Sequence, residues 1–363
     1  MKNRSLRSSL LGKALVPGSA LVLALSGVAE AHTASVTVAS PGPTIGPGTP
    51  FTGVSADADC PQGLVTGGGA DQETGDNRAG NGNHIMGVSP SSDGATEYLD
   101  TAGVVGADAT HWLAFGGSGS NSSPAFSTTP YAMCLTSNGI RHTLVVMNKA
   151  AGPSVGQTAQ LVVATCPAGT RLLGGGARAT PASVGSLKPI ASYPTFADAA
   201  HDFGQKAAAD GETNPDSWAA VGGIGGGRND DNTTYAYTIC TGFGVDAKHD
   251  TTTVHFRETA GPTVASTSQK VTTGCTDADG VLVSGGAAAS GGSVTSTDFT
   301  KAGSGGTHLI GSFPSDADGV ALGDGTGDAA SWTADIHAGG SPSPNTFSDV
   351  WALCLNVRDG QGR

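Results

Sequence analysis

The chain contains three copies of one sequence unit, and this triplication limits its possible folds more than any other feature. Each copy has a leading cysteine, at positions 60, 166 and 275, followed shortly by a glycine-rich segment: 64–70 (LVTGGGA), 171–177 (RLLGGGA) and 281–287 (VLVSGGA). A tryptophan stands at positions 112, 218 and 332 and a closing cysteine at 134, 240 and 354, so their interval is 22 residues in every copy. We therefore divide the chain into residues 32–139, 140–248 and 249–363, called repeats 1, 2 and 3.

Short alternating segments predict strands in every repeat. Around the closing cysteines, residues 131–135, 237–241 and 351–355 alternate so that large apolar side chains share one face and the cysteine takes the other. Each repeat opens with a β-branched segment that ends at a turn, at Gly42-Pro43, Gly152-Pro153 and Gly261-Pro262. We expect five to seven strands per repeat, and hence an all-β protein of three tandem, disulfide-closed antiparallel β-sandwich (jelly-roll-like) repeats. Independent domains are favoured over the alternative, a single threefold core.

The six cysteines predict three disulfides. Pairing alone allows 15 connectivities, but one leading and one closing cysteine per repeat favours Cys60–Cys134, Cys166–Cys240 and Cys275–Cys354. Only 5% of residues are aromatic, so each repeat has few large apolar side chains for a core. A bridge that closes so long a loop contributes about 4 kcal/mol in the chain-entropy model. No cysteine or histidine spacing is that of a metal site, and no metal ligand is predicted.

Residues 1–31 have the pattern of a signal peptide. Basic residues precede an apolar stretch, 14–28, and Ala29-Glu30-Ala31 follows it as a cleavage site, so we expect the mature chain to begin at His32. The apolar stretch is shorter than the roughly 20 residues of a membrane-spanning helix, and no lipid attachment or sorting signal follows. The predicted product is a soluble, secreted, extracellular protein.

The formal net charge of this product limits the classes of partner that it is expected to bind. Removal of the signal peptide leaves 14 basic and 29 acidic residues, a formal charge of -15. Nucleic acids and anionic membranes bind basic surfaces, so neither is an expected partner.

The repeated cysteine and glycine segments resemble two groups of proteins. Cys-Pro-x-Gly at 60–63 and 166–169, followed by Gly-Gly-Gly-Ala and an aromatic strand ending in cysteine, looks like secreted triplicated repeat proteins of actinobacteria that lack an assigned biochemical role. The Cys-x-x-Gly segment with its glycine turn is also similar to the triplicated cysteine-rich C-terminal region of proprotein convertase subtilisin/kexin type 9, a protein-binding module. These resemblances imply an extracellular location and transfer no functional residue.

Two glycine patterns could indicate chemistry. Gly152-Pro153-Ser154-Val155-Gly156 matches the G-x-S-x-G nucleophile elbow, but strands flank it where an elbow needs a following helix, so we interpret it as a turn. The Gly-Gly-Gly segments lack the GK[ST] of a phosphate loop and are interpreted as places of close backbone approach. No catalytic residue is predicted.

The acidic clusters and repeated basic positions leave alternatives open. Acidic residues gather at 57–59, 277–279, 316–318 and 230–231, but none completes a calcium loop, so solvated turns are favoured over bound Ca²⁺ and no cofactor is predicted. His84, Lys188 and His308 occupy equivalent places, either as three ligand-facing sites or as strand-edge surface positions. The histidines show no repeated pairing with a carboxylate.

The sequence allows two roles for the three tryptophans. Trp112, Trp218 and Trp332 either pack against the disulfides in a core or form a sugar-stacking platform, and the core is favoured. We expect a secreted, non-enzymatic protein that binds an extracellular glycan or cell-envelope surface through tandem copies. A module that binds or inhibits another secreted protein is the alternative, and a divergent hydrolase the second alternative. Ligand identity and oligomeric state cannot be derived from the sequence.

Overall fold

The computed structural model describes residues 33–72, 82–120, 125–156, 158–180, 187–224, 231–243, 250–290, 306–327, 329–339 and 346–357. The expected signal peptide, 1–31, and mature start, His32, lie outside these ranges. The all-β class is confirmed, because the described elements are antiparallel strands and one short 3-10 helix, η1 (Asp202–Gly204). Within these ranges no helix is long and apolar enough to span a membrane.

The strands follow a common order in the three repeats, with six described strands in repeats 2 and 3, as expected, and two additional strands in repeat 1, which has more than the expected five to seven. Repeat 1 contains β1 (Ala34–Ala39), β2 (Thr44–Ile45), β3 (Gly53–Asp59), β4 (Leu64–Asp71), β5 (Asn83–Ser91), β6 (Gly103–Ala107), β7 (His111–Ser118) and β8 (Ser127–Ser137). Repeat 2 contains β9 (Thr143–Ala151), β10 (Ala159–Thr165), β11 (Leu172–Thr180), β12 (Leu187–Thr195), β13 (Ser217–Ile224) and β14 (Thr233–Thr241). Repeat 3 contains β15 (Thr251–Ala260), β16 (Thr267–Gly274), β17 (Val281–Ser290), β18 (Thr307–Ser315), β19 (Ser331–Ala338) and β20 (Phe347–Asn356).

Each repeat divides into two three-stranded halves that pack together as a small sandwich. In repeat 1 these halves are β1-β8-β4 and β3-β7-β5, and β3 and β7 contact β8 across the sandwich. Repeats 2 and 3 divide in the same way, into β9-β14-β11 with β10-β13-β12, and β15-β20-β17 with β16-β19-β18. The predicted sandwich is therefore present in each repeat.

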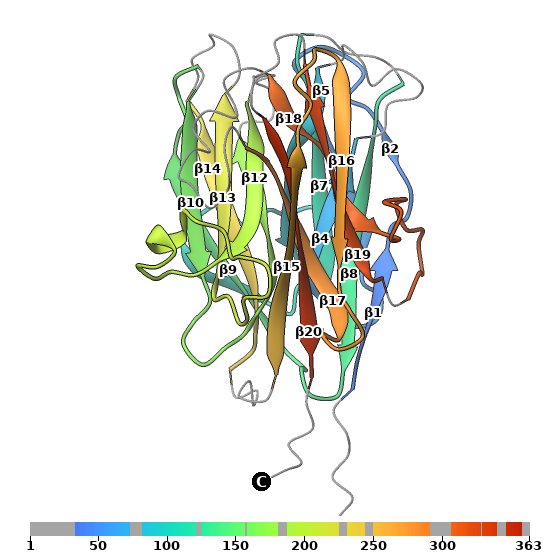
Figure 1. Ribbon diagram of the computed structural model, residues 1–363, viewed down its shortest axis with the longest axis vertical. Helices are drawn as coiled ribbons and strands as arrows, with labels where there is room; N and C mark the ends of the chain where they lie inside the picture. Colours follow the sequence, from blue (N-terminus) through green and yellow to red (C-terminus); the bar gives the residue numbers. More distant parts are fainter. Residues whose placement is uncertain are drawn as a thin grey trace, which may run out of the picture.

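The sandwiches are fused to one another through their sheets. The three sheets have the orders β1-β8-β4-β18-β19-β16, β3-β7-β5-β11-β14-β9-β6 and β10-β13-β12-β17-β20-β15, so each sheet combines halves of two repeats. At the joins Gly311 pairs with Asp71, Arg178 with Gly87, and Ala191 with Ala288. The strands run along the long axis of the molecule (Figure 1). Because each sheet shares one repeat with each of the other two, the three sheets close into a prism around that axis.

This arrangement corrects the expectation of three independent domains. One cluster of buried apolar side chains contains residues of all three repeats, including Trp112, Trp218 and Trp332. A repeat removed from the prism would expose the inner edges of both of its halves, because its neighbours' strands complete both sheets. The similar lengths of the repeats did not reveal this, since a fused ring and a row of separate domains have the same repeat boundaries and the same number of strands in each repeat.

The Gly-Gly-Gly segments make the close packing at the axis possible. A Cβ atom at Gly68 would lie within 3.0 Å of the Trp112 ring, and the equivalent Gly175 and Gly285 meet Trp218 and Trp332 in the same way. The next glycine faces the join, where a Cβ at Gly69 would collide with the Ser312 carbonyl of repeat 3. The glycines are therefore places of close approach, as predicted.

Candidate functional site: a connection that crosses between repeats

The segment between β5 and β7 of repeat 1, residues 92–110, lies on repeat 2 and is called the repeat 1 connection. Its strand β6 pairs with β9 of repeat 2. The corresponding connections of repeats 2 and 3 reach their neighbours in the same way, through the bridges Thr213↔Thr253 and Thr37↔Gly327. Each connection therefore pairs with the edge of the sheet that its repeat shares with the neighbouring repeat.

A buried ion pair fixes the start of the repeat 1 connection. The Arg178 guanidinium donates hydrogen bonds of 2.8 and 3.3 Å to the Glu97 carboxylate. It also lies over the Phe115 ring, 3.8 Å from the centroid. Because the Arg178 and Glu97 side chains are 4% and 16% exposed, water competes little with this contact.

Two further side chains of repeat 2 hold the connection by its backbone. The Lys149 ammonium donates to the carbonyls of Leu99 and Asp100, both at 2.6 Å. The Tyr237 hydroxyl donates to the Tyr98 carbonyl at 3.1 Å. Burial, and then the Glu97 charge, raise the pKa of Tyr237 well above its ordinary value, so the phenol keeps the proton it donates.

A hollow of about 330 Å³ opens on this tethered segment. Its lining consists of Thr96, Glu97, Tyr98, Leu99, Asp100, Thr101, Ala102, Val104 and Val105. The volume lies at the lower end of the range for small-molecule sites. One half-buried aromatic ring, hydroxyl groups and carboxylates give the hollow the groups that bind a small hydroxylated ligand.

The three predicted disulfides are present. Cys60–Cys134, Cys166–Cys240 and Cys275–Cys354 have Cα separations of 5.5, 5.7 and 5.7 Å. In each pair the leading cysteine follows a strand of one sheet and the closing cysteine lies in a strand of another, as with β3 and β8. Each bridge therefore stays within its repeat while it connects two sheets.

The tryptophans belong to the core. Trp112, Trp218 and Trp332 are 0% exposed, so they cannot stack on a ligand at the surface. The core interpretation is confirmed, and the platform interpretation is wrong.

The equivalent basic residues are also buried. His84, Lys188 and His308 begin the inner strands β5, β12 and β18, which contact one another around the axis. They are therefore neither strand-edge surface residues nor three separate sites.

The G-x-S-x-G segment forms a turn between β9 and β10, with Ser154 exposed, as predicted. The assignment of the equivalent turn in repeat 1 was wrong by four residues. The backbone N–H of Gly46 donates to the Phe126 carbonyl at 2.7 Å, as Gly152 donates to Asn232 and Gly261 to Thr346. Gly46-Pro47, and not Gly42-Pro43, is therefore the counterpart of the other turns.

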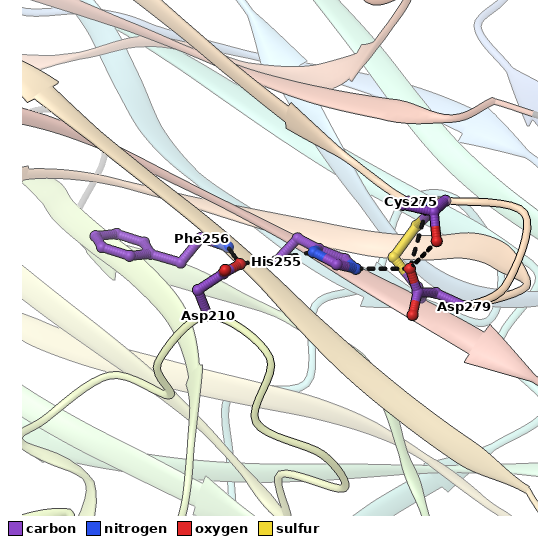
Figure 2. Close-up of a disulfide and its surroundings, with 7 residues drawn as sticks. Asp210, His255, Phe256, Cys275 and Asp279 are labelled. Carbon is purple, nitrogen blue, oxygen red and sulfur yellow. Dashed lines mark hydrogen bonds and ion pairs between the residues drawn. A yellow bond between two sulfur atoms is a disulfide. The ribbon is translucent and has the colours of Figure 1, made fainter.

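Four of the described histidines pair with carboxylates, and these pairs lie at positions that are not equivalent between the repeats. His111 bonds Asp57 and His142 bonds Asp108, both at 2.9 Å. His255 of β15 lies 2.9 Å from Asp279 and 3.5 Å from Asp210, beside the Cys275 disulfide (Figure 2).

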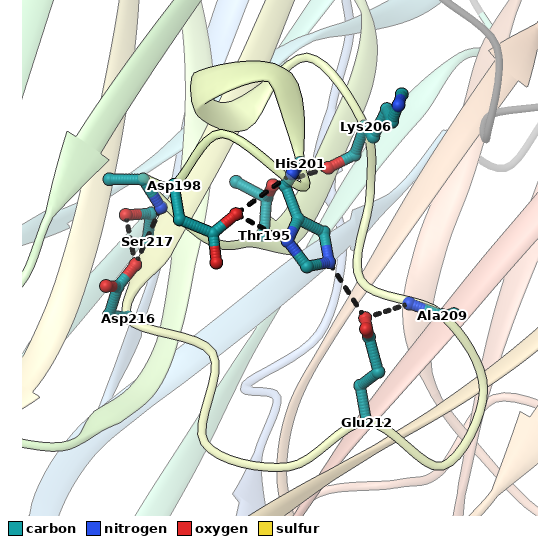
Figure 3. Close-up of polar contacts among 9 residues, drawn as sticks. Thr195, Asp198, His201, Lys206, Ala209, Glu212, Asp216 and Ser217 are labelled. Atoms are coloured by element: carbon teal, nitrogen blue, oxygen red, sulfur yellow. Dashed lines mark hydrogen bonds and ion pairs between the residues drawn. The ribbon is translucent and has the colours of Figure 1, made fainter.

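The fourth, His201, lies between Asp198 and Glu212 on the repeat 2 connection (Figure 3). Burial opposes protonation of His201, but the hydrogen bonds to both carboxylates raise its pKa above the ordinary value. His201 and Asp198 are three residues apart, whereas the other hydrogen-bonded pairs join residues that are 11 to 54 apart in the sequence.

The acidic clusters do not all form the expected turns. Residues 57–59 end strand β3, so the turn prediction is wrong there, whereas 277–279 and 316–318 lie in turns. Asp316 accepts hydrogen bonds from the N–H groups of Asp318 and Val320. Asp230 of the 230–231 pair lies outside the described residues. Across the described ranges, no group of three or more histidine, cysteine or acidic side chains is arranged to hold a metal ion.

A comparison with protein-family models finds no match to this chain. A comparison with curated proteins finds none either.

Proposed function

We propose that this protein is a secreted, non-enzymatic binding protein that takes a glycan into the hollow on the repeat 1 connection. The observation that carries this proposal is the fixation of residues 97–100 by three side chains of repeat 2. A loop already held in place loses little conformational freedom when a ligand binds, which improves affinity. The three disulfides support an oxidising, extracellular environment.

The chemistry of the hollow favours a neutral or amino-substituted sugar. Tyr98 supplies the aromatic face that the buried tryptophans cannot supply, and Thr96 and Thr101 supply hydroxyl groups. Asp100 is exposed, while Arg178 already neutralises Glu97. An anionic polymer would meet the Asp100 carboxylate and a surface of net negative charge.

Exposed apolar residues on the connections favour a protein partner as the second candidate. Val104, Phe203 and Val320 are 53%, 67% and 61% exposed, and each lies on a different connection. Phe203 also has a φ of 51°, in the left-handed region, which costs conformational energy in a residue other than glycine. Exposed apolar side chains are common on protein-binding surfaces.

Retention on insoluble polysaccharides, with Tyr98→Ala compared against Phe203→Ala, separates the two candidates. We expect the wild-type protein to bind at least one neutral or amino-sugar polymer, Tyr98→Ala to lose that binding, and Phe203→Ala to keep it. Unchanged melting temperatures would show that both variants fold. Equal retention of Tyr98→Ala and wild type, or no retention of the wild type on any polymer, would reject the glycan proposal. Capture of an extracellular protein that Phe203→Ala abolishes would support the second candidate.

A further inference from the structure

Three equivalent basic side chains meet where the inner strands surround the axis. His84, Lys188 and His308 come from repeats 1, 2 and 3, and the rings of His84 and His308 lie 5.9 Å apart between centroids. The residues that follow them, Ile85, Pro189 and Leu309, line an axial void of about 30 Å³. We call His84, Lys188, His308 and the neighbouring His337 the axial basic layer.

Two members of the axial basic layer, Lys188 and His308, are buried with no carboxylate partner among the described residues. His84, Lys188 and His308 are 2%, 6% and 3% exposed, and His337 is 1% exposed. The His308 ring is 5.4 Å from that of His337. Within the described ranges, no carboxylate hydrogen-bonds or forms an ion pair with Lys188 or His308. An uncompensated ammonium group in such a place destabilises the folded state.

Three ring nitrogens of His84 and His308 lie within hydrogen-bond distance of backbone carbonyls. The two ring nitrogens of His308 lie 2.6 and 2.9 Å from the carbonyls of Gly306 and Asn83, and Nδ1 of His84 lies 2.9 Å from that of Gly82. A neutral imidazole has one N–H, so only a protonated His308 can donate to both carbonyls. The neutral ring therefore donates to only one of the two carbonyls, and His308 must take up a proton before it can donate to both.

Lys188 differs from the histidines because no described residue hydrogen-bonds its ammonium group. Burial lowers the pKa of Lys188 to about 8, so the amine is still largely protonated at neutral pH. Burial, and then the nearby Lys188 charge, lower the pKa of His308 well below its ordinary value. A bound negative charge would relieve both effects.

We propose that the axial basic layer binds one small anion, an inorganic oxyanion or a carboxylate group, with the Lys188 ammonium as its direct ligand. A cation is a poor occupant, because Lys188 repels it and both nitrogens of His308 are engaged. The site differs from the hollow on the repeat 1 connection, shares no residue with it and does not depend on the proposed function.

The first test measures thermal stability against sulfate, phosphate and acetate at constant ionic strength in chloride. A ligand that binds only the folded state stabilises it in proportion to the logarithm of its concentration above Kd. We expect a rise in Tm of several degrees in at least one titration. In the same titration the Tm of Lys188→Met should not change. The Tm of Lys206→Met, which removes a lysine from the repeat 2 connection, should rise as it does for the wild type. Sulfate or phosphate effects indicate an inorganic oxyanion, and an acetate effect indicates a carboxylate.

The second test follows the Lys188 ammonium itself by NMR. Saturation with the active anion should move the pKa of Lys188 upward from about 8, and anion affinity should fall as the pH rises through that value. Lys188→Gln serves in the titration if Lys188→Met does not fold. No anion effect in the wild type, or an equal effect in wild type and the Lys188 variants, would overturn the proposal.

Discussion

The indole nitrogen of Trp218 donates a hydrogen bond of 2.8 Å to Ser192 Oγ, and Trp332 makes the equivalent bond of 3.0 Å to Ser312 Oγ. In repeat 1 the position of these serines is taken by Val88, and Trp112 Nε1 has no hydrogen-bond partner among the described residues. Each of the three sandwiches therefore contains a buried tryptophan. Only in repeats 2 and 3 does a described residue accept a hydrogen bond from the indole N–H.

Ser192→Ala should destabilise the protein, because it leaves a buried indole N–H without an acceptor. The expected loss is about 1–3 kcal/mol, measured by chemical denaturation. Ser89→Ala is the matched control: the Ser89 hydroxyl is buried and has no partner in the described ranges, so its removal should leave stability unchanged or slightly higher. Equal losses for the two variants would contradict the role assigned to the Trp218 bond.

Removal of one disulfide should lower the stability of the whole molecule. Cys166→Ala with Cys240→Ala opens a loop with a sequence separation of 74, and the chain-entropy model gives a loss of about 4 kcal/mol. Because repeat 2 shares its sheets with both neighbours, calorimetry should show one cooperative transition at a lower Tm. Separate transitions, with only one shifted, would restore the picture of independent domains.

Gly68→Ala should prevent normal packing. The added methyl group would lie within 3.0 Å of the Trp112 ring and of the Tyr131 carbonyl, in a place where neither can move freely. We expect a loss of about 3 kcal/mol or more, or no folded protein. Gly323→Ala, which has no atom within 4 Å of its added Cβ, should change stability by less than about 0.5 kcal/mol.

The repeat 2 connection should loosen as the pH rises. The raised pKa of His201 means that protonated His201 stabilises the folded state. This contribution is complete below the unfolded value of about 6.5 and is lost as the pH rises through the higher folded value. Hydrogen exchange of residues 198–212, corrected for intrinsic rates, should therefore speed up as the pH rises above about 6.5.

His201→Asn should remove this pH dependence from the connection. His142→Asn, which changes a largely exposed histidine paired with Asp108, should leave it intact. A pH dependence that survives in His201→Asn would assign the effect to another group.

The sequence was informative wherever a property belongs to one repeat. The interval between Trp218 and Cys240 recurs in the other repeats, so disulfide pairing and the sandwich could be predicted from a single unit. The contacts of Gly69 with repeat 3, and of Arg178 with Glu97, depend on which neighbour each repeat meets. A sequence pattern within one repeat does not show which other repeat its residues will contact.

The same reasoning explains the candidate sites. His84, Lys188 and His308 were recognised as equivalent, but equivalence around an axis brings residues together, whereas equivalence along a row keeps them apart. The hollow at Tyr98 could not be predicted from the sequence. The side chains that hold it in place, Lys149 and Tyr237, come from another repeat and have no characteristic sequence spacing from Tyr98.

The order in which the sheets join also bears on how such a chain could arise. Repeat 1 meets repeat 3 at β4, repeat 3 meets repeat 2 at β17, and repeat 2 meets repeat 1 at β11, which closes a ring. β1 begins and β20 ends at the same end of the molecule (Figure 1). Three separate copies of one ancestral repeat could therefore assemble as a homotrimer with the same joins. After gene fusion the three copies could change independently, so that one has a lysine where the other two have a histidine at the axis. The Arg178–Glu97 ion pair and the hydrogen bonds of Lys149 could likewise be present between one pair of repeats alone.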